Sequence, residues 1–249
     1  MEKLEKQNIE DIFSLTPLQE GMLFFYLRDT NSDLYFEQLS LSITGTVDPD
    51  IFEKAWNFVT ADNAMLRALY RWERIKSPTQ VILKEHRTNI SYIDLNESKP
   101  KISAAEIKER DKKDSFDLRT VPFRITLCKV DRETYEMIIS HHHILYDGWS
   151  NGVILKEFFS AYENLSTGKK LVKKQKSHFK EYIGWIRSRD ASRQAKFWQE
   201  YLSGFDTPTS LSVKRMAGRD TANIVNHTAK LEKNIRAGLE EFTKKKKVT

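Results

Sequence analysis

The segment Ser-His-His-His-Ile-Leu-Tyr-Asp-Gly-Trp-Ser, residues 140–150, largely decides how this chain is interpreted. It holds half of the six histidines of the sequence. The residues from 135 to 143 alternate apolar and polar side chains, as a β-strand does, so His141 and His143 share one face and His142 lies on the other. Asp147-Gly148 predicts a turn out of the strand, and Ser150 is expected to cap a following helix. Functional groups are commonly held at such junctions of strand, turn and helix.

The sequence on both sides extends this strand into a layered domain. Residues 123–130 also alternate, and the four residues 131–134 are short enough to close a β-hairpin with the histidine strand. Downstream, a helix is expected from Ser150 to about Leu165. Upstream, strands are predicted over residues 35–45 and 66–72, and the second of them carries Arg67.

Several sequence signals for helix starts occur in the remaining sequence. Thr16-Pro-Leu-Gln19 and Ser103-x-x-Glu106 are capping boxes, and the first predicts a helix to about Arg28. A further helix is expected to open at Asp48-Pro49, because apolar residues follow it at helical spacing. Strands interleaved with helices predict an α/β or α+β layered fold with a mixed sheet flanked by helices.

The last third of the chain changes character. Two aromatic-rich helical stretches are expected around residues 179–186 and 197–202, and the turn Gly204 to Pro208 is the expected boundary. Beyond it, residues 222–231 indicate a strand and residues 232–247 a helix. We therefore divide the chain into a lobe over residues 13–204 and a linker with the start of a second lobe over residues 205–249.

Composition excludes several classes of protein. The 249 residues are 39% hydrophobic, contain no apolar run near the ~20 residues that cross a membrane, and begin without a signal peptide. A single cysteine, Cys128, rules out an internal disulfide, and we expect a soluble cytoplasmic protein. The net charge is +6, but no nucleic-acid-binding motif accompanies it, so neither nucleic acid nor membrane is an expected partner.

Three interpretations of the histidines stay open from the residues alone. They can be satisfied residues of a sheet, they can hold a metal, or one of them can be the base of an acyl transfer whose nucleophile comes from the substrate. A metal site lacks further ligands, because His86, His178 and His227 are isolated in sequence. Cys128 is a poor candidate nucleophile, because it lies inside an expected strand with nothing to activate it.

Four motifs in order give the chain a family resemblance. Residues 142–148, His-His-Ile-Leu-Tyr-Asp-Gly, resemble the HHxxxDG motif of nonribosomal peptide synthetase condensation domains, which are similar to chloramphenicol acetyltransferase. Residues 15–24, Met65-Leu-Arg67, and Phe116-Asp-Leu with Pro122-Phe-Arg124 resemble further elements of that family. Epimerisation domains continue the motif differently after Asp-Gly, and heterocyclisation domains replace the histidines by aspartates, so condensation is favoured.

The resemblance implies amide-bond formation between thioesters tethered to the 4'-phosphopantetheine of carrier proteins. His143 is then the residue at the reacting groups, as a base or as a group that orients the amine, and His142, Asp147 and Gly148 complete the motif. Asp147 is expected to pair with Arg67 in a structural role, Gly148 to let the substrate arm approach the backbone, and Trp149 to be a packing residue. The resemblance implies no cofactor and no metal of the domain's own.

The ends of the chain carry two further expectations. Residues 1–12 resemble the acceptor docking segments of synthetase subunits, so a separate upstream subunit is an expected partner, although a terminus without any partner is equally compatible. Relative to a two-lobed condensation domain the chain looks truncated at Thr249. The alternative function is therefore a docking or scaffold fragment that binds a carrier protein or an upstream subunit and completes no reaction.

Overall fold

The computed structural model describes residues 5–30, 32–97, 101–173, 175–207, 209 and 228–248. The chain separates into two compact units, Met1–Ser192 and Arg193–Thr249. This division lies at the start of helix α6 (Ala191–Tyr201) rather than in the turn at Gly204, and α6 has no buried residue of its own. The histidine motif lies wholly within the first unit.

A four-stranded mixed sheet forms the centre of the first unit, in the order β2-β7-β6-β5. Strand β7 (Thr134–His142) is antiparallel to both β2 (Phe36–Thr44) and β6 (Phe123–Lys129), whereas β5 (Asn89–Asp94) runs parallel to β6. The predicted hairpin of β6 and β7 and the predicted strand β2 are confirmed. The sequence analysis did not anticipate β5.

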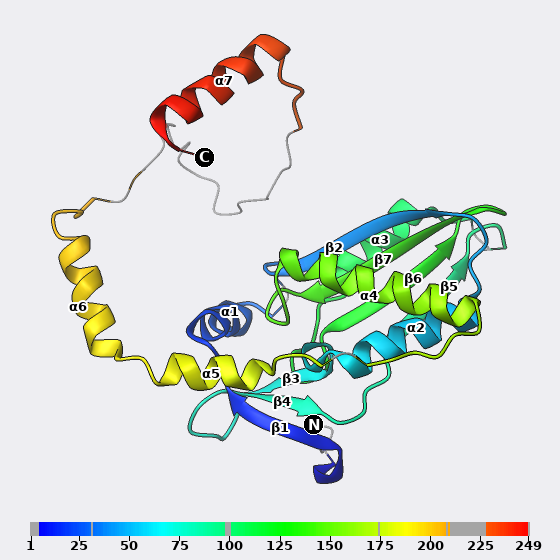
Figure 1. Cartoon of the computed structure of the whole chain (residues 1–249), viewed down its shortest axis with the longest axis horizontal. Helices are drawn as coiled ribbons and strands as arrows, with labels where there is room; N and C mark the ends of the chain where they lie inside the picture. Colours follow the sequence, from blue (N-terminus) through cyan, green and yellow to red (C-terminus); the bar gives the residue numbers. More distant parts are fainter. Residues whose placement is uncertain are drawn as a thin grey trace. The chain divides into compact units, whose positions relative to one another are not determined.

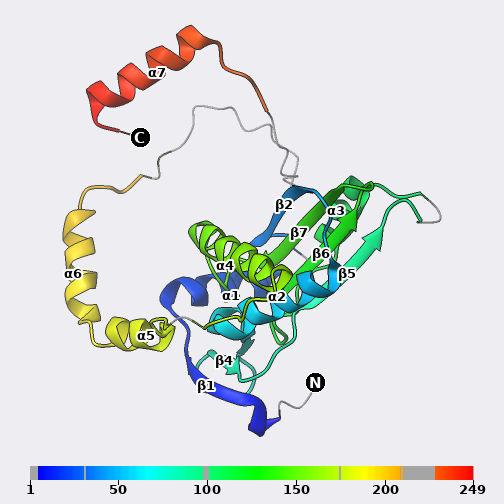
Figure 2. The ribbon, with the colours of Figure 1, turned by 45° about the vertical axis from the view of Figure 1, so that its right-hand side comes forward.

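Helices cover both faces of this sheet (Figures 1 and 2). Helices α2 (Pro49–Asp62) and α4 (Gly148–Ser166) lie side by side on one face, where Trp56 of α2 stacks on Phe158 of α4 with ring centroids 4.5 Å apart. Helix α3 (Ala104–Lys113) covers the other face, where its Ile107 packs with Cys128 and Ile138. The layered α/β architecture with a mixed sheet is therefore confirmed.

Local capping fixes where these helices begin. Thr16 and Ser103 form the two predicted capping boxes, and α1 (Pro17–Arg28) ends where expected. At α4 the prediction was wrong by one turn: Asp147, not Ser150, is the N-cap. Its backbone is extended and its side chain accepts the Ser150 N–H, so Ser150 already lies in the first turn of the helix.

A second sheet has three antiparallel strands in the order β1-β4-β3. Strand β4 (Thr79–Leu83) lies between β1 (Ile9–Ser14) and β3 (Ala68–Arg71), and short 3-10 turns precede β1 (Lys6–Asn8) and β3 (Ala64–Arg67). Residues 9–12, which we assigned to a docking segment, thus belong to the folded lobe. Arg67, which we placed in a strand, lies in the turn before β3.

Helix α5 (Phe179–Arg187) is tied to β1 within the first unit. The rings of Phe13 and Phe179 lie 6.3 Å apart, and Lys180 forms an ion pair with Asp11 at 2.8 Å. The aromatic helix predicted around residues 179–186 is confirmed, and it lies beside the start of α1 (Figure 1).

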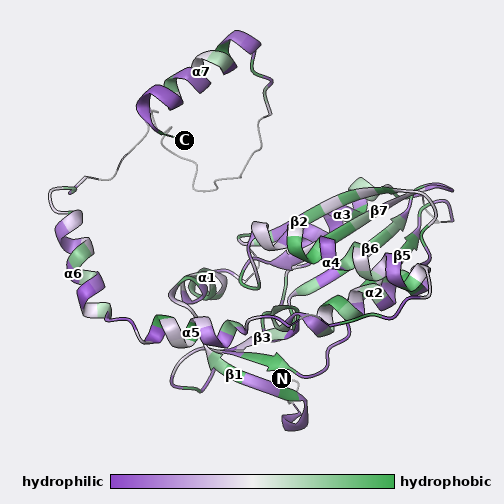
Figure 3. Cartoon of the chain, viewed as in Figure 1, coloured by the Kyte–Doolittle hydropathy of each residue, from purple (hydrophilic) through white to green (hydrophobic). Residues whose placement is uncertain are grey.

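The second unit contains the predicted C-terminal helix, α7 (Lys233–Lys246), which is largely hydrophilic (Figure 3). Residues 222–227 of the strand expected there lie outside the described residues, and residues 228–231 are not in a strand. Within the described part of the chain, no helix is long and apolar enough to cross a membrane.

Candidate active site

A groove of about 550 Å³ opens where the histidine strand ends. The start of α1, the turn after β7 and one side of α5 form its walls. His143, Tyr146 and Asp147 line it from the turn, and Met22, Tyr182 and Ile186 line it from the two helices. The family-like motif therefore faces a space large enough for an extended substrate.

His143 presents its ring to this groove from a fixed backbone position. Its N–H donates to the Tyr35 carbonyl at 2.8 Å, which extends the pairing of β2 and β7 by one more residue. Its imidazole is parallel to the Tyr35 ring, with an interplanar angle of 3° and centroids 6.4 Å apart. The side chain is 31% exposed, although its Nδ1 is buried and has no hydrogen-bond partner among the described residues.

Three side chains hold the turn that follows. The Ile144 N–H donates to Nδ1 of His142 at 3.1 Å. The Ile144 carbonyl accepts from Gln19 Nε2 at 3.1 Å and from the Tyr70 hydroxyl at 3.0 Å. Helix α1, strand β3 and strand β7 thus fix both peptide groups of Ile144, next to His143, and this limits where the His143 ring can lie.

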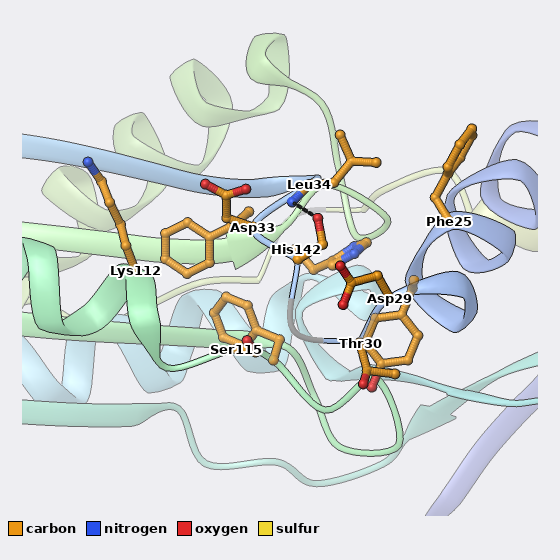
Figure 4. Close-up of a pocket in the computed structure, with 12 residues that line it drawn as sticks. Phe25, Asp29, Thr30, Asp33, Leu34, Lys112, Ser115 and His142 are labelled. Atoms are coloured by element: carbon orange, nitrogen blue, oxygen red, sulfur yellow. Dashed lines mark hydrogen bonds between the residues drawn. The ribbon is translucent and has the colours of Figure 1, made fainter. Parts of the chain in front are cut away.

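His142 itself lies in a separate pocket. Figure 4 shows it among Asp29, Asp33, Leu34 and Ser115, and it does not line the groove that holds His143. Burial lowers the pKa of His142 to about 4, so the ring is neutral near pH 7. We expected both His142 and His143 in the catalytic motif, with their side chains on opposite faces of the strand. The two side chains do line different pockets, and His142 supports the turn through the Ile144 N–H.

His141 is also buried and neutral. Its ring stacks on Tyr146 with centroids 3.9 Å apart, and its Nδ1 shares a hydrogen bond of 3.0 Å with the Tyr146 hydroxyl. Burial lowers the pKa of His141 to about 3. This residue therefore braces the turn from the sheet side and is not placed to carry a proton to a substrate.

Asp147 and Gly148 occupy the exposed start of α4. Asp147 accepts from the Ser150 N–H at 3.0 Å and from the Ser150 hydroxyl at 2.8 Å, and these bonds lower the pKa of the Asp147 carboxyl. A Cβ at Gly148 meets no described atom within 4 Å, so the fold itself does not require glycine there. That Gly148 admits a substrate arm stays a prediction. Trp149, which we expected to be a packing residue, is 90% exposed and so is not packed among the described residues.

The expected pair of Asp147 with Arg67 is not present. Arg67 is buried and its guanidinium donates to Glu10 and to the carbonyls of Thr60, Leu83 and Lys84. Its partner is therefore Glu10, a carboxylate of β1, whereas Asp147 caps the start of its own helix α4. Arg67 keeps a structural role, but its role is to join β1 to the end of β4.

Replacement of Arg67 by alanine is expected to lower the free energy of unfolding by about 3 kcal/mol, because buried carbonyls lose their donor. Asp147→Ala removes one helix cap and is expected to cost about 1 kcal/mol. Denaturant unfolding of the two single variants and the double variant measures both. The double variant should lose the sum of the two single losses in free energy of unfolding, to within about 0.5 kcal/mol. A larger deviation from this sum would show that Arg67 and Asp147 interact after all.

Metal and thiol chemistry receive little support from the geometry. Among the described residues no group of three His, Cys, Asp or Glu side chains is placed to hold a metal ion, and His227 lies outside them. Cys128 is buried in β6, and burial raises its thiol pKa to about 11, so thiolate is scarce near neutral pH. His86 is half-buried, and this partial burial lowers its pKa, and neither His86 nor His178 lines the groove.

That the chain binds no metal stays a prediction with a direct test. A stable zinc site uses about four protein or water ligands, and His141 and His143 alone offer two. Elemental analysis of the dialysed protein is expected to find zinc far below one equivalent. One equivalent that is lost in a His143→Ala variant would contradict the prediction.

Several residues that shape the site escaped the sequence analysis. Tyr35, in the turn before β2, Glu37 in β2 and Tyr70 in β3 reach it from positions far away in sequence, and no local pattern marks them. Gln19 was recognised only as a capping residue. Its Oε1 does accept the Thr16 N–H, but its Nε2 donates to the turn, so one amide side chain serves both the helix start and the site.

Comparison with known proteins defines the class of this lobe. The starter condensation domain of the rhizomide synthetase superposes with a TM-score of 0.71 at 18% identity, over 80% of this chain and 50% of that one. The first condensation domain of the CDA synthetase gives 0.70 at 17% identity, over 82% of this chain and 51% of that one. The fold is therefore that of a nonribosomal peptide synthetase condensation domain, and the chain matches about half of each solved domain.

The sequence comparisons agree and fix the family. The family model for the condensation domain matches residues 9–249. A linear gramicidin synthase of Brevibacillus parabrevis is 31% identical over 99% of this chain, and bacitracin synthase 3 of Bacillus licheniformis is 34% identical over 97%. The chain belongs to the condensation domain family. It spans only 5% and 4% of the length of those two synthetases.

Proposed function

We propose that this chain supplies one side of a catalytic site, the side that carries His143. The site forms an amide bond between two carrier-bound thioesters. The observation that carries the proposal is the position of His143, on a braced turn at the edge of a groove of about 550 Å³. Membership of the condensation domain family supports the reaction class.

The reaction joins two substrates without a protein nucleophile. The α-amine nitrogen of the acceptor attacks the carbonyl carbon of the donor thioester, so a C–N bond forms and the C–S bond breaks. The donor arm leaves as a thiolate and becomes a thiol with the proton that the amine nitrogen gives up. His143 acts on that proton as a base, or it orients the amine, and both roles need its ring at the groove.

The same proposal names the partners and the setting. The substrates are tethered to 4'-phosphopantetheine on carrier proteins of the upstream module and of the same module, and the domain uses no cofactor of its own. An upstream synthetase subunit is a further proposed partner. The segment that would dock it precedes Ile9, because residues from Ile9 onward form β1. The proposed location is the cytoplasm, and antibiotic synthesis is the proposed context.

A reconstituted condensation assay tests this function. The chain, fused to the second half of a related condensation domain, is mixed with one carrier charged as donor and another charged as acceptor. Mass spectrometry is expected to detect the dipeptidyl thioester on the acceptor carrier, and none when the acceptor carrier is uncharged. If both carriers bind the fusion but no product forms, the docking and scaffold function replaces the proposed one.

A further inference from the structure

We propose that Glu37 is a positioning residue for His143: its carboxylate faces Nδ1 of the imidazole, holds the proton there, and leaves Nε2 free to meet the acceptor amine. The inference concerns how this chain orients its histidine and rests on the proposed function for its catalytic consequence. Three observations support it: the register of β2 and β7, the buried state of Nδ1, and the backbone of Tyr35.

The strand register places the two side chains on one face. Glu37 pairs with His141 across β2 and β7, and the ladder continues to Tyr35 opposite His143. Side chains of such directly and diagonally opposed residues lie on the same side of a sheet and within reach of one another. Glu37 Oε1 accordingly lies 3.7 Å from Nδ1 of His143.

Nδ1 of His143 needs a partner. It is buried and makes no hydrogen bond among the described residues, and a buried polar atom without a partner is unfavourable. The separation of 3.7 Å from Glu37 exceeds a hydrogen bond by less than 1 Å. The Glu37 side chain is 52% exposed, so it has room to make that small rotation.

Tyr35 fixes the plane in which this contact forms. Its backbone has φ of 67°, a left-handed conformation that is rare outside glycine and is retained only where the surroundings impose it. In this conformation its carbonyl accepts the His143 N–H and its ring is parallel to the imidazole. The ring of His143 therefore lies parallel to the Tyr35 ring, with Nδ1 on the side of Glu37.

The chemical consequence is a choice of tautomer. A neutral imidazole carries one proton, and the nitrogen that faces an anionic acceptor is the one that keeps it. A proton on Nδ1 leaves the lone pair on Nε2, on the part of the ring that is not buried. A base oriented by a third group in this way is a recurrent arrangement in acyl transfer.

Nuclear magnetic resonance tests the tautomer without any turnover. The chain is labelled with ¹⁵N-histidine, and ring nitrogen shifts are read at about pH 9, above the ordinary imidazole pKa of ~6.5. Disappearance of signals in His143→Ala assigns them. We expect a protonated Nδ1 in the unaltered chain, its retention in Glu37→Gln, and transfer of the proton to Nε2 in Glu37→Leu. A proton on Nε2 in the unaltered chain, or no change in Glu37→Leu, would overturn the inference.

Turnover of the fusion with a second lobe measures the consequence. Glu37→Leu is expected to lower kcat about tenfold with KM within about twofold, on the scale of other groups that orient a functional side chain. Glu133→Leu makes the same chemical change in the β6–β7 turn and should alter neither the tautomer nor kcat. An unchanged kcat in Glu37→Leu contradicts the inference. An inactive unaltered fusion instead contradicts the proposed function, whereas the tautomer result stands or falls separately.

Discussion

Replacement of His143 by alanine, in the fusion that contains both lobes, is expected to reduce the yield of dipeptidyl thioester by ~10² or more. This is the usual scale for loss of a group that transfers or orients a proton. The ring lies at the groove, it makes no hydrogen bond to described residues, and it is 31% exposed. Its removal therefore takes away a reactive group without taking away a hydrogen bond that supports the fold.

Two matched histidine variants show whether this loss is chemical. His142→Ala removes the acceptor of the Ile144 N–H, so it is expected to lower both the melting temperature and the yield. His178→Ala changes an exposed residue at the start of α5 and should leave both unchanged. His143→Ala should retain the parent melting temperature and lose only the yield. Full turnover in that variant would remove His143 from the mechanism.

Elements coded by neighbouring residues could be predicted from the sequence. The capping boxes at Thr16 and Ser103 and the hairpin of β6 and β7 depend on residues a few positions apart, so a local pattern is sufficient. Strands β1, β4 and β5 could not be predicted with the same means. Each is short and pairs with a strand from elsewhere in the chain, so tertiary contacts decide its conformation.

The sequence identified the motif that forms the site, but it did not determine how the side chains of the site are arranged in space. The sequence located the turn from His142 to Gly148 and placed the side chains of His142 and His143 on opposite faces of the strand, yet it could not show which residues line the pocket on each face. The pairing of Asp147 with Arg67 came from resemblance alone. It failed because each residue has a nearer partner, Ser150 for Asp147 and Glu10 for Arg67. Long-range partners such as Glu37 carry no sequence signal of their own.

The 249-residue chain assayed by itself is expected to bind carriers but to form no dipeptidyl thioester. It matches about half of each solved condensation domain, and among the described residues its groove is lined by α1, α5, the turn at His143 and Met65. Attack of an amine on a thioester requires the two reacting atoms to be held about 3–3.5 Å apart. A single wall can place His143, but it cannot hold two tethered substrates in that arrangement.

Addition of the second half of a related domain as a separate polypeptide is the informative comparison. Product should rise above background only when both halves are present, and it should fall again when the first half carries His143→Ala. The dependence on His143 matters because it shows that the added half completes this groove and does not react by itself. Water competes for the thioester in an open site, so the chain alone should at most release free amino acid from the donor. Dipeptide formation by the chain alone, lost in His143→Ala, would show that one lobe suffices for catalysis and would contradict the two-walled site.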